Sequence, residues 1–142
     1  MNVVVDTSVW SLALRRSDSQ LSRQEQLLRA EFAELISEGR VQIIGPIRQE
    51  LLSGIREELY YRRVRDYLRA LDDEPLTIED FEQAASASHK CRAAGVTGSP
   101  FDFLICVAAM RHNWSVFTTD QDFAAYARHL PLRLYAPRPA RL

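Results

Sequence analysis

The sequence predicts an α/β protein in which a mostly parallel β-sheet lies between two layers of helices, a three-layer α/β/α sandwich. Two observations predict this class. Short apolar runs alternate along the chain with longer segments of helical periodicity. The 142 residues also suffice for one domain with a full hydrophobic core, and no internal repeat or low-complexity linker divides them. Strands separated by helices pair in parallel, because antiparallel neighbours need only a short turn.

Each expected element has a local cause. Ser22 and Glu25 form a capping-box pattern that opens a helix. Pro46 suits the first turn of a short helix, and Ser99–Pro100 is a strong helix start. The expected strands are 2–6, 41–45, 114–119 and 132–136. The expected helices are 7–16, 22–38, 46–54, 55–71, 77–95, 99–112 and 121–129.

Composition narrows the class of protein. The start, MNVVVD, lacks the basic region of a signal peptide, and the uncharged apolar run 103–110 is too short to span a bilayer. Two cysteines make no disulfide framework, which favours a reducing compartment and hence the cytoplasm. We expect no membrane association, a single domain over 1–136 and a loose tail over 137–142.

The positive charge is almost entirely arginine. Seventeen of the 18 basic residues are arginine, and Lys90 is the only lysine. Codon bias explains most of this preference, although arginine also suits phosphate contacts. If four carboxylates are set aside for one site, 18 basic residues face 15 acids (19 − 4), so the remaining surface tolerates an anionic substrate.

Asp102 is the only polar residue between Phe101 and Met110. With Ser99 it fits a capping box, which is a purely structural explanation. Its helix is apolar almost all round, however, and Asp102 shares one side with Ile105 and Cys106. A carboxylate on a buried side needs a partner, and this helix offers no basic residue before Arg111.

Three further acids follow expected strands. Glu50 lies about 60° from Ile47 on a helical wheel, so it points towards the inner face. Asp6 ends the first strand, and Asp120 follows the strand SVFTT. Each has a plain structural explanation, as a rim glutamate or a helix N-cap.

Taken together, these acids predict a metal site. The carboxyl ends of parallel strands meet at one edge of a sheet, where α/β folds carry their sites. Crowded carboxylates stay ionised only when a cation joins them. Oxygen ligands without histidine or thiolate select Mg²⁺ or Mn²⁺, and such sites serve phosphoryl chemistry. Asp6 and Asp102 are the expected direct ligands, and Glu50 and Asp120 the groups that position a second ion or the attacking water.

Four stretches in order along the chain resemble the motifs of PIN-domain ribonucleases, and of VapC toxins of bacterial toxin–antitoxin pairs in particular. They are VVVDTSVW, QELLSG, SPFDFLICVAAMRHN and FTTDQDF. The resemblance implies a PIN-like sandwich, an Mg²⁺- or Mn²⁺-dependent endoribonuclease, an RNA substrate, a small VapB-like antitoxin as partner and a homodimer. It implies Asp6, Glu50, Asp102 and Asp120 as the acidic set. It also implies Ser8, Thr118 and Asp122 as supporting residues of the pocket. The stretch FLICVAAM departs from the alanine-rich pattern of the family, which changes packing rather than chemistry.

Other features leave alternatives open. Arg62, Arg65 and Arg69 follow one line of a helix, either as a solvated face with pairs such as Glu58–Arg62 or as contacts to RNA phosphates. The histidines and cysteines fit no zinc spacing. A phosphatase or receiver-type domain fits badly, because Ser8 stands where a second acid is needed and the only lysine lies in a helix. A non-catalytic RNA-binding or regulatory PIN-like protein stays the main alternative, and a histidine-based ribonuclease a lesser one.

Overall fold

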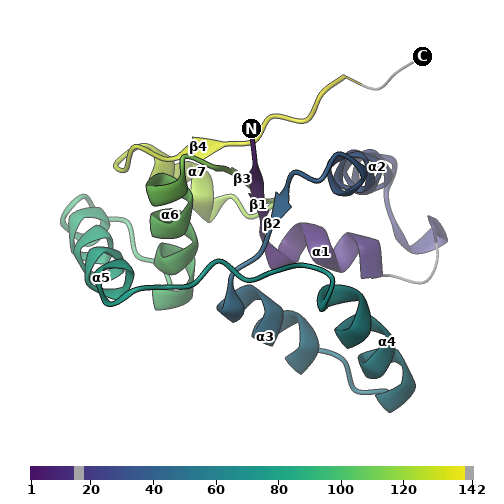
Figure 1. Cartoon of the computed structure of the whole chain (residues 1–142). Helices are drawn as coiled ribbons and strands as arrows, with labels where there is room; N and C mark the ends of the chain where they lie inside the picture. The colour runs from purple at the N-terminus through teal and green to yellow at the C-terminus, as the bar shows by residue number, and fades with distance from the viewer. Residues whose placement is uncertain (15–17, 140–142) are drawn as a thin grey trace.

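The structure, a computed structural model, describes residues 1–14 and 18–139 (Figure 1). Its centre is a sheet of short parallel strands in the order β2-β1-β3-β4. The strands among the described residues are β1 (Val3–Val5), β2 (Val41–Gln42), β3 (Ser115–Phe117) and β4 (Arg133–Leu134). The predicted parallel sheet is therefore confirmed.

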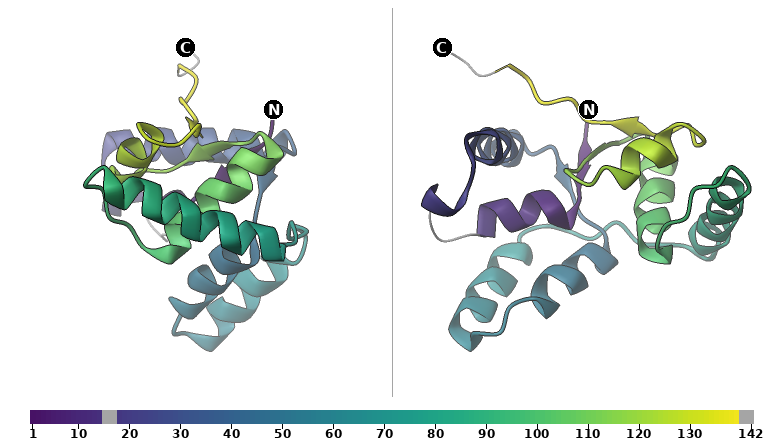
Figure 2. Two further views of the ribbon diagram at one scale, coloured as in Figure 1. Left: turned by 90° about the vertical axis from the view of Figure 1, so that its left-hand side faces the viewer. Right: turned by 180° about the vertical axis from the view of Figure 1, so that it is seen from behind.

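Helices cover both faces of this sheet. They are α1 (Thr7–Leu14), α2 (Arg23–Ser37), α3 (Gly45–Ser53), α4 (Glu58–Leu68), α5 (Ile78–Ala93), α6 (Pro100–His112) and α7 (Asp122–Ala127), with a 3₁₀ turn at Asp18–Gln20. Figures 1 and 2 show α5 and α6 on one side of the sheet and α1 and α2 on the other, with α3 and α4 paired beyond the carboxyl ends of the strands. The predicted three-layer sandwich is confirmed.

The core explains why the apolar runs became these elements. Val3, Val4 and Val5 are fully buried, because both faces of β1 are covered. Ile105 and Cys106 of α6 are also fully buried, as the sequence predicted. No helix in the described part of the chain has the length and apolarity needed to cross a membrane.

Local signals mark the helix starts well. Ser22 and Glu25 form the predicted capping box, and Thr77 with Asp80 forms another. Ser99 accepts a hydrogen bond from the Asp102 amide, one half of the box expected there. Pro46 lies in the first turn of α3, as expected.

Several boundaries differ from the prediction. The helix expected over 55–71 is only Glu58–Leu68, because its apolar pattern continues into a turn at Leu71 that also packs on the core. The strand expected over 41–45 ends at Gln42, because Ile44 is the extended cap of α3. The strands expected over 114–119 and 132–136 shorten to Ser115–Phe117 and Arg133–Leu134, and the helix over 121–129 to Asp122–Ala127. The end of the helix expected over 7–16 lies outside the described residues.

Candidate metal centre

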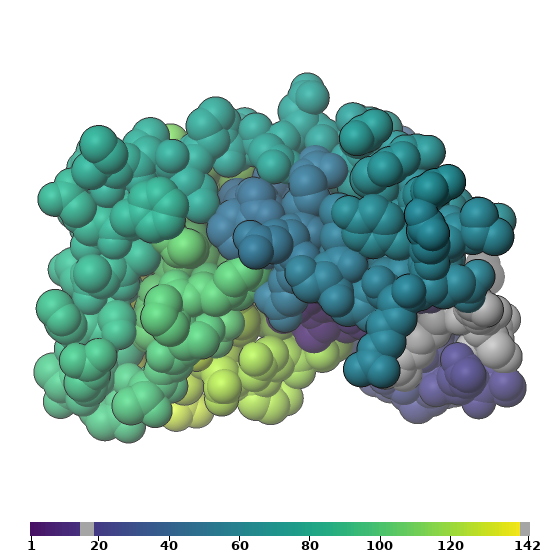
Figure 3. All heavy atoms as spheres, turned by 90° about the horizontal axis from the view of Figure 1, so that it is seen from below, coloured from purple at the N-terminus to yellow at the C-terminus, as the bar shows by residue number. Residues whose placement is uncertain are grey.

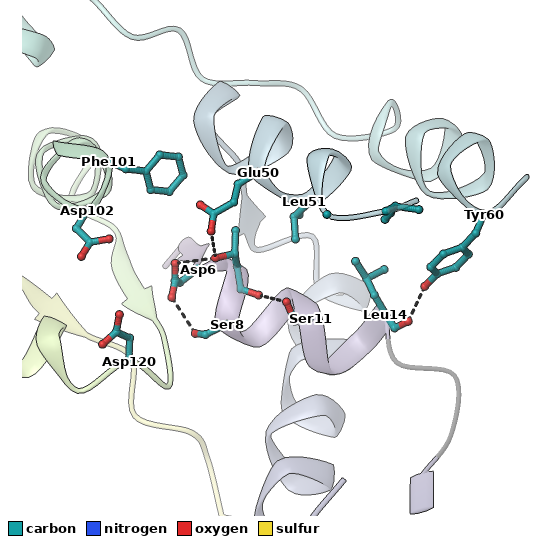
Figure 4. Close-up of a pocket in the computed structure, with 13 residues that line it drawn as sticks. Asp6, Ser8, Ser11, Leu14, Glu50, Leu51, Tyr60, Phe101, Asp102 and Asp120 are labelled. Atoms are coloured by element: carbon teal, nitrogen blue, oxygen red, sulfur yellow. Dashed lines mark hydrogen bonds between the residues drawn. The ribbon is translucent and has the colours of Figure 1, made fainter. Parts of the chain in front are cut away.

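A cavity of about 490 Å³ opens at the carboxyl ends of β1 and β3. Four acids from distant parts of the sequence line it: Asp6, Glu50, Asp102 and Asp120. Seen from below in Figure 3, the N-terminal segment lies in a hollow between α3 and the segment that follows β3. In Figure 4 the carboxylates of Asp6, Asp102 and Asp120 point towards one another, and Glu50 approaches from α3.

Sheet register fixes Asp6. Val5 pairs with Phe117, so the residues that follow them, Asp6 and Thr118, lie side by side. Asp6 is buried, with only 6 % of the residue exposed. Its Oδ2 accepts hydrogen bonds from the Ser8 hydroxyl at 2.8 Å and from the Thr118 hydroxyl at 2.9 Å. These two donors hold Oδ2, whereas Oδ1 is 3.5 Å from the Thr7 hydroxyl, a contact long enough to yield to a ligand.

Asp102 lies in the first turn of α6 and is half-buried. Its Oδ2 accepts a hydrogen bond from the Tyr126 hydroxyl at 2.7 Å. Burial raises the pKa of Asp102, and the negative charges of Asp120 and Asp6 raise it further, although hydrogen bonds from Tyr126 and Ser99 oppose the rise. Burial and the neighbouring negative charges therefore both oppose the ionised form of Asp102.

Glu50 is exposed on α3, at the mouth of the cavity. Its Oε1 accepts a hydrogen bond from the Thr7 hydroxyl at 3.2 Å. The same hydroxyl lies 3.5 Å from Asp6 Oδ1, so Thr7 stands between two of the acids. Oε2 of Glu50 is left to face water or substrate.

Asp120 and Asp122 follow β3. The Asp120 amide donates to the Thr118 hydroxyl at 2.9 Å, and Asp120 Oδ1 accepts from the Asp122 amide at 2.9 Å. One carboxylate oxygen from each of Asp102, Asp120 and Asp122 lies within 4.8 Å of the other two. That spacing is suitable for oxygen atoms that share one cation.

The donors fit a hard divalent ion. The polar side chains that line the cavity carry only carboxylate and hydroxyl oxygens, which Mg²⁺ and Mn²⁺ prefer. A cation would also relieve the repulsion that raises the pKa of Asp102. The residues present therefore fit such an ion.

The structure brings together every acid named from the sequence, and it places the supporting residues beside them. Ser8 and Thr118 both donate to Asp6, and Asp122 joins Asp102 and Asp120. The arginine line lies elsewhere, on α4 and just after it. There Arg62 pairs with Glu58 at 2.6 Å as expected, and Arg65 pairs with the neighbouring Asp66 at 3.2 Å. Arg69 is exposed.

Two residues of the site were missed by sequence reasoning. Thr7 was not among the expected pocket residues, yet its hydroxyl lies between Asp6 and Glu50, at 3.5 Å and 3.2 Å from their carboxylate oxygens. Tyr126 was counted only as part of a helix, yet it donates to Asp102 across 24 positions. A tyrosine on an apolar helix face gives no signal of its polar partner, so only the tertiary structure shows this bond.

The C-terminal segment is held at Arg138, in contrast to the loose tail expected over 137–142. The Arg138 guanidinium pairs with Glu31 at 2.8 Å and with Glu38 at 2.8 Å, and its amide donates to Glu31 at 2.6 Å. Burial of Glu31 works against its charge, but the Arg138 bonds still lower the pKa of this carboxyl. Residues 140–142, with Arg141, lie outside the described residues. Cys91 and Cys106 are both buried and unpaired thiols.

Comparison with known proteins agrees with this architecture. Three solved structures share the fold over 95 % of this chain. They are FitAcB from Neisseria gonorrhoeae (TM-score 0.73, 19 % identity, 97 % of that chain), VapBC2 from Rickettsia felis bound to a DNA fragment from their promoter (0.73, 16 %, 98 %), and FitAB bound to an IR36 DNA fragment (0.75, 18 %, 94 %). The PIN domain family model matches residues 3–129, a range that contains all four acids of the cavity. The chain belongs to the PIN domain family.

Proposed function

We propose that this protein is an endoribonuclease that hydrolyses RNA phosphodiester bonds with Mg²⁺ or Mn²⁺. One observation carries the proposal: acids from four distant segments line one open cavity, with hydroxyl donors holding Asp6 and Asp102. Membership of the PIN domain family supports the same reading.

The residues divide the chemistry between them. Asp6 and Asp102 would hold the ion, because hydrogen bonds to Oδ2 fix the orientation of each carboxylate. A bound divalent ion would supply Lewis acidity, which neutralises phosphate charge and activates water. Glu50 Oε2 faces the mouth and takes the proton from the attacking water, while Thr7 fixes Oε1. Asp120 directs the leaving side of the substrate or holds a second ion.

The walls of the cavity suit a nucleic acid chain. Phe101 lines the cavity next to Asp102, and Tyr60 lines its far end beside Leu14, with Leu51 and Ile55 also in the wall (Figure 4). Aromatic and apolar surfaces of this kind stack the bases of single-stranded RNA. Arg62, Arg65 and Arg69 would add phosphate contacts on α4, since ion pairs at exposed sites are weak enough to exchange.

We also propose that the protein is the toxin of a toxin–antitoxin pair. The motif resemblance to VapC toxins and the shared fold with chains of the VapBC2 and FitAB structures support this role. A small VapB-like antitoxin would hold the nuclease inactive in the cytoplasm, where its RNA substrate lies. A homodimer would cover exposed apolar side chains such as Leu27 on α2 and Leu59 and Tyr67 on α4.

Chelation tests the nuclease proposal. Purified protein is incubated with RNA in EDTA, and then with added Mn²⁺ or Mg²⁺. We expect cleavage only with the ion, and loss of at least about 100-fold in Asp102→Asn, which removes one ligand charge. Asp66→Asn is the matched control, because Asp66 is an aspartate on α4 paired with Arg65, outside the cavity.

The outcomes separate the alternatives. Cleavage that persists in EDTA would point to histidine chemistry. RNA binding without cleavage under any metal would favour a non-catalytic RNA-binding or regulatory protein. Co-purification of a small DNA-binding protein encoded by an overlapping upstream reading frame would support the toxin role, and its absence from the locus would count against that role.

A further inference from the structure

We propose that Tyr126 is a positioning residue for the carboxylate of Asp102, and that Gly98 keeps open the space that the Tyr126 hydroxyl needs. The inference rests on the proposed function, because it assigns to Asp102 a role in holding the ion. It adds two uncharged residues, Tyr126 and Gly98, to the four acids of the cavity.

The direction of the Tyr126 hydroxyl is fixed by the core. Tyr126 is fully buried on α7. Its ring packs against Phe103 at 4.9 Å and Phe123 at 5.3 Å between centroids. Because the ring cannot swing, its O–H reaches Asp102 Oδ2 at 2.7 Å in one geometry.

Gly98 stands directly against this hydroxyl. A Cβ at position 98 would overlap the Tyr126 hydroxyl oxygen and lie 2.7 Å from Cζ and 2.8 Å from Cε1. The backbone of Gly98 does not adopt the positive φ seen at Gly39 and Gly95, so glycine is needed here for space and not for conformation. A rigid, fully packed ring has nowhere to retreat, and any larger residue would displace the hydroxyl from Asp102.

The hydrogen bond matters because Asp102 is half-buried and crowded. Carboxylates that ligate metals are usually held by a further hydrogen bond, and loss of that bond typically costs about 10- to 100-fold in metal affinity or activity. With Oδ2 held by Tyr126, the Asp102 carboxylate is fixed where one of its oxygens lies within 4.8 Å of carboxylate oxygens of Asp120 and Asp122. Without the donor, the carboxylate is free to rotate and loses stabilisation of its charged form.

A purely structural reading is that the bond merely satisfies a buried phenol. The two readings differ in what Tyr126→Phe changes. That substitution keeps the ring and its contacts and removes only the O–H. A structural role predicts a change in stability alone, whereas a positioning role predicts weaker binding of the ion.

The test measures Mn²⁺ binding by electron paramagnetic resonance of free Mn²⁺, with folding checked by urea unfolding. Tyr126→Phe is expected to weaken Mn²⁺ binding by about 10-fold or more. Tyr135→Phe is the matched control, because its hydroxyl also donates to a carboxylate, Glu31, at 3.1 Å but far from the cavity. In RNA cleavage, the Mn²⁺ concentration for half-maximal rate should rise by the same factor in Tyr126→Phe, and saturating Mn²⁺ should restore most of the rate.

The possible results of this test separate the inference on Tyr126 from the nuclease proposal. Mn²⁺ affinity of Tyr126→Phe within twofold of the wild type and of Tyr135→Phe overturns the inference while leaving the nuclease proposal intact. Wild-type protein that binds no Mn²⁺, or binds it equally in Asp102→Asn, overturns both. Should Tyr126→Phe fail to fold, Gly98→Ala reaches the same bond from the other side: weakened Mn²⁺ binding supports the inference, and wild-type binding in that variant refutes it.

Discussion

The crowding of carboxylates around Asp102 predicts that its removal stabilises the metal-free protein. Asp102→Asn keeps the shape of the side chain, and the amide oxygen still accepts the hydrogen bond from Tyr126. What disappears is one negative charge near Asp120 and Asp122. The substitution therefore isolates the electrostatic cost that the proposed ion is meant to relieve.

The geometry sets the size of the effect. Two unit charges 4.8 Å apart repel by about 3.5 kcal/mol at an effective dielectric of about 20. Asp120 and Asp122 are exposed, so water reduces this repulsion to about 1 kcal/mol. Each 1 kcal/mol shifts the melting temperature of a chain of this size by about 3 °C.

The assay is thermal and urea unfolding with and without Mn²⁺. In EDTA at pH 7, Asp102→Asn should melt about 3 °C above the wild type. With Mn²⁺ at 100 times its Kd, the wild type should gain about 2.7 kcal/mol and the variant far less, so the order of stability reverses. Asp66→Asn should follow the wild type in both conditions.

The pH dependence has a definite sign. The pKa of Asp102 is raised above 3.8, so the native state binds more protons than the unfolded state in the interval above that value. The stability of the wild type in EDTA relative to Asp102→Asn therefore falls as pH rises through this interval, and the advantage of Asp102→Asn vanishes below it. A variant less stable than the wild type in EDTA at pH 7, or one that gains equally from Mn²⁺, would refute the crowding argument.

Three further predictions concern other contacts. Asp80 is almost fully buried and pairs with Arg111 at 2.7 Å, so Asp80→Asn should lower the unfolding free energy of the protein by about 3 kcal/mol. Burial opposes the charge of Asp80, but Arg111 still holds its pKa below 3.8, so wild-type urea stability should decline as pH falls through that low pKa. Thr7→Val should reduce the rate of RNA cleavage by about 10-fold and change the free energy of urea unfolding by less than about 1 kcal/mol. A variant that cleaves RNA at the wild-type rate would show that Thr7 has no role in the site. Glu31→Gln should speed hydrogen exchange in residues 133–138 by releasing Arg138, and unchanged protection there would contradict the anchoring.

The sequence was most informative where the cause is local. Capping residues such as Ser22 and Thr77 mark helix starts, because their bonds span only three positions. The single carboxylate of Asp102 in an apolar helix also indicated a functional site, because a buried charge is costly unless it is paired or binds a cation. Short parallel strands could be located, but not delimited, since their pairing partners lie far away in the sequence.

What the sequence could not show are the neighbours that hold the acids. Tyr126 and Gly98 meet Asp102 through packing between α6, α7 and the loop before α6, which no periodicity encodes. Arg138 looked like part of a loose tail because its partners, Glu31 and Glu38, lie about a hundred positions earlier. Contacts of such range depend on the completed fold.

The pairing of Val5 with Phe117 has a consequence for biosynthesis. The Thr118 hydroxyl donates to Asp6, and Asp120 is the last of the four cavity acids along the chain. A nascent chain that has not yet reached this point therefore carries no complete centre, however well its earlier helices have formed. For the ribonuclease proposed above, the fold itself would postpone the first possible cut until the segment that carries Asp120 has been synthesised and folded.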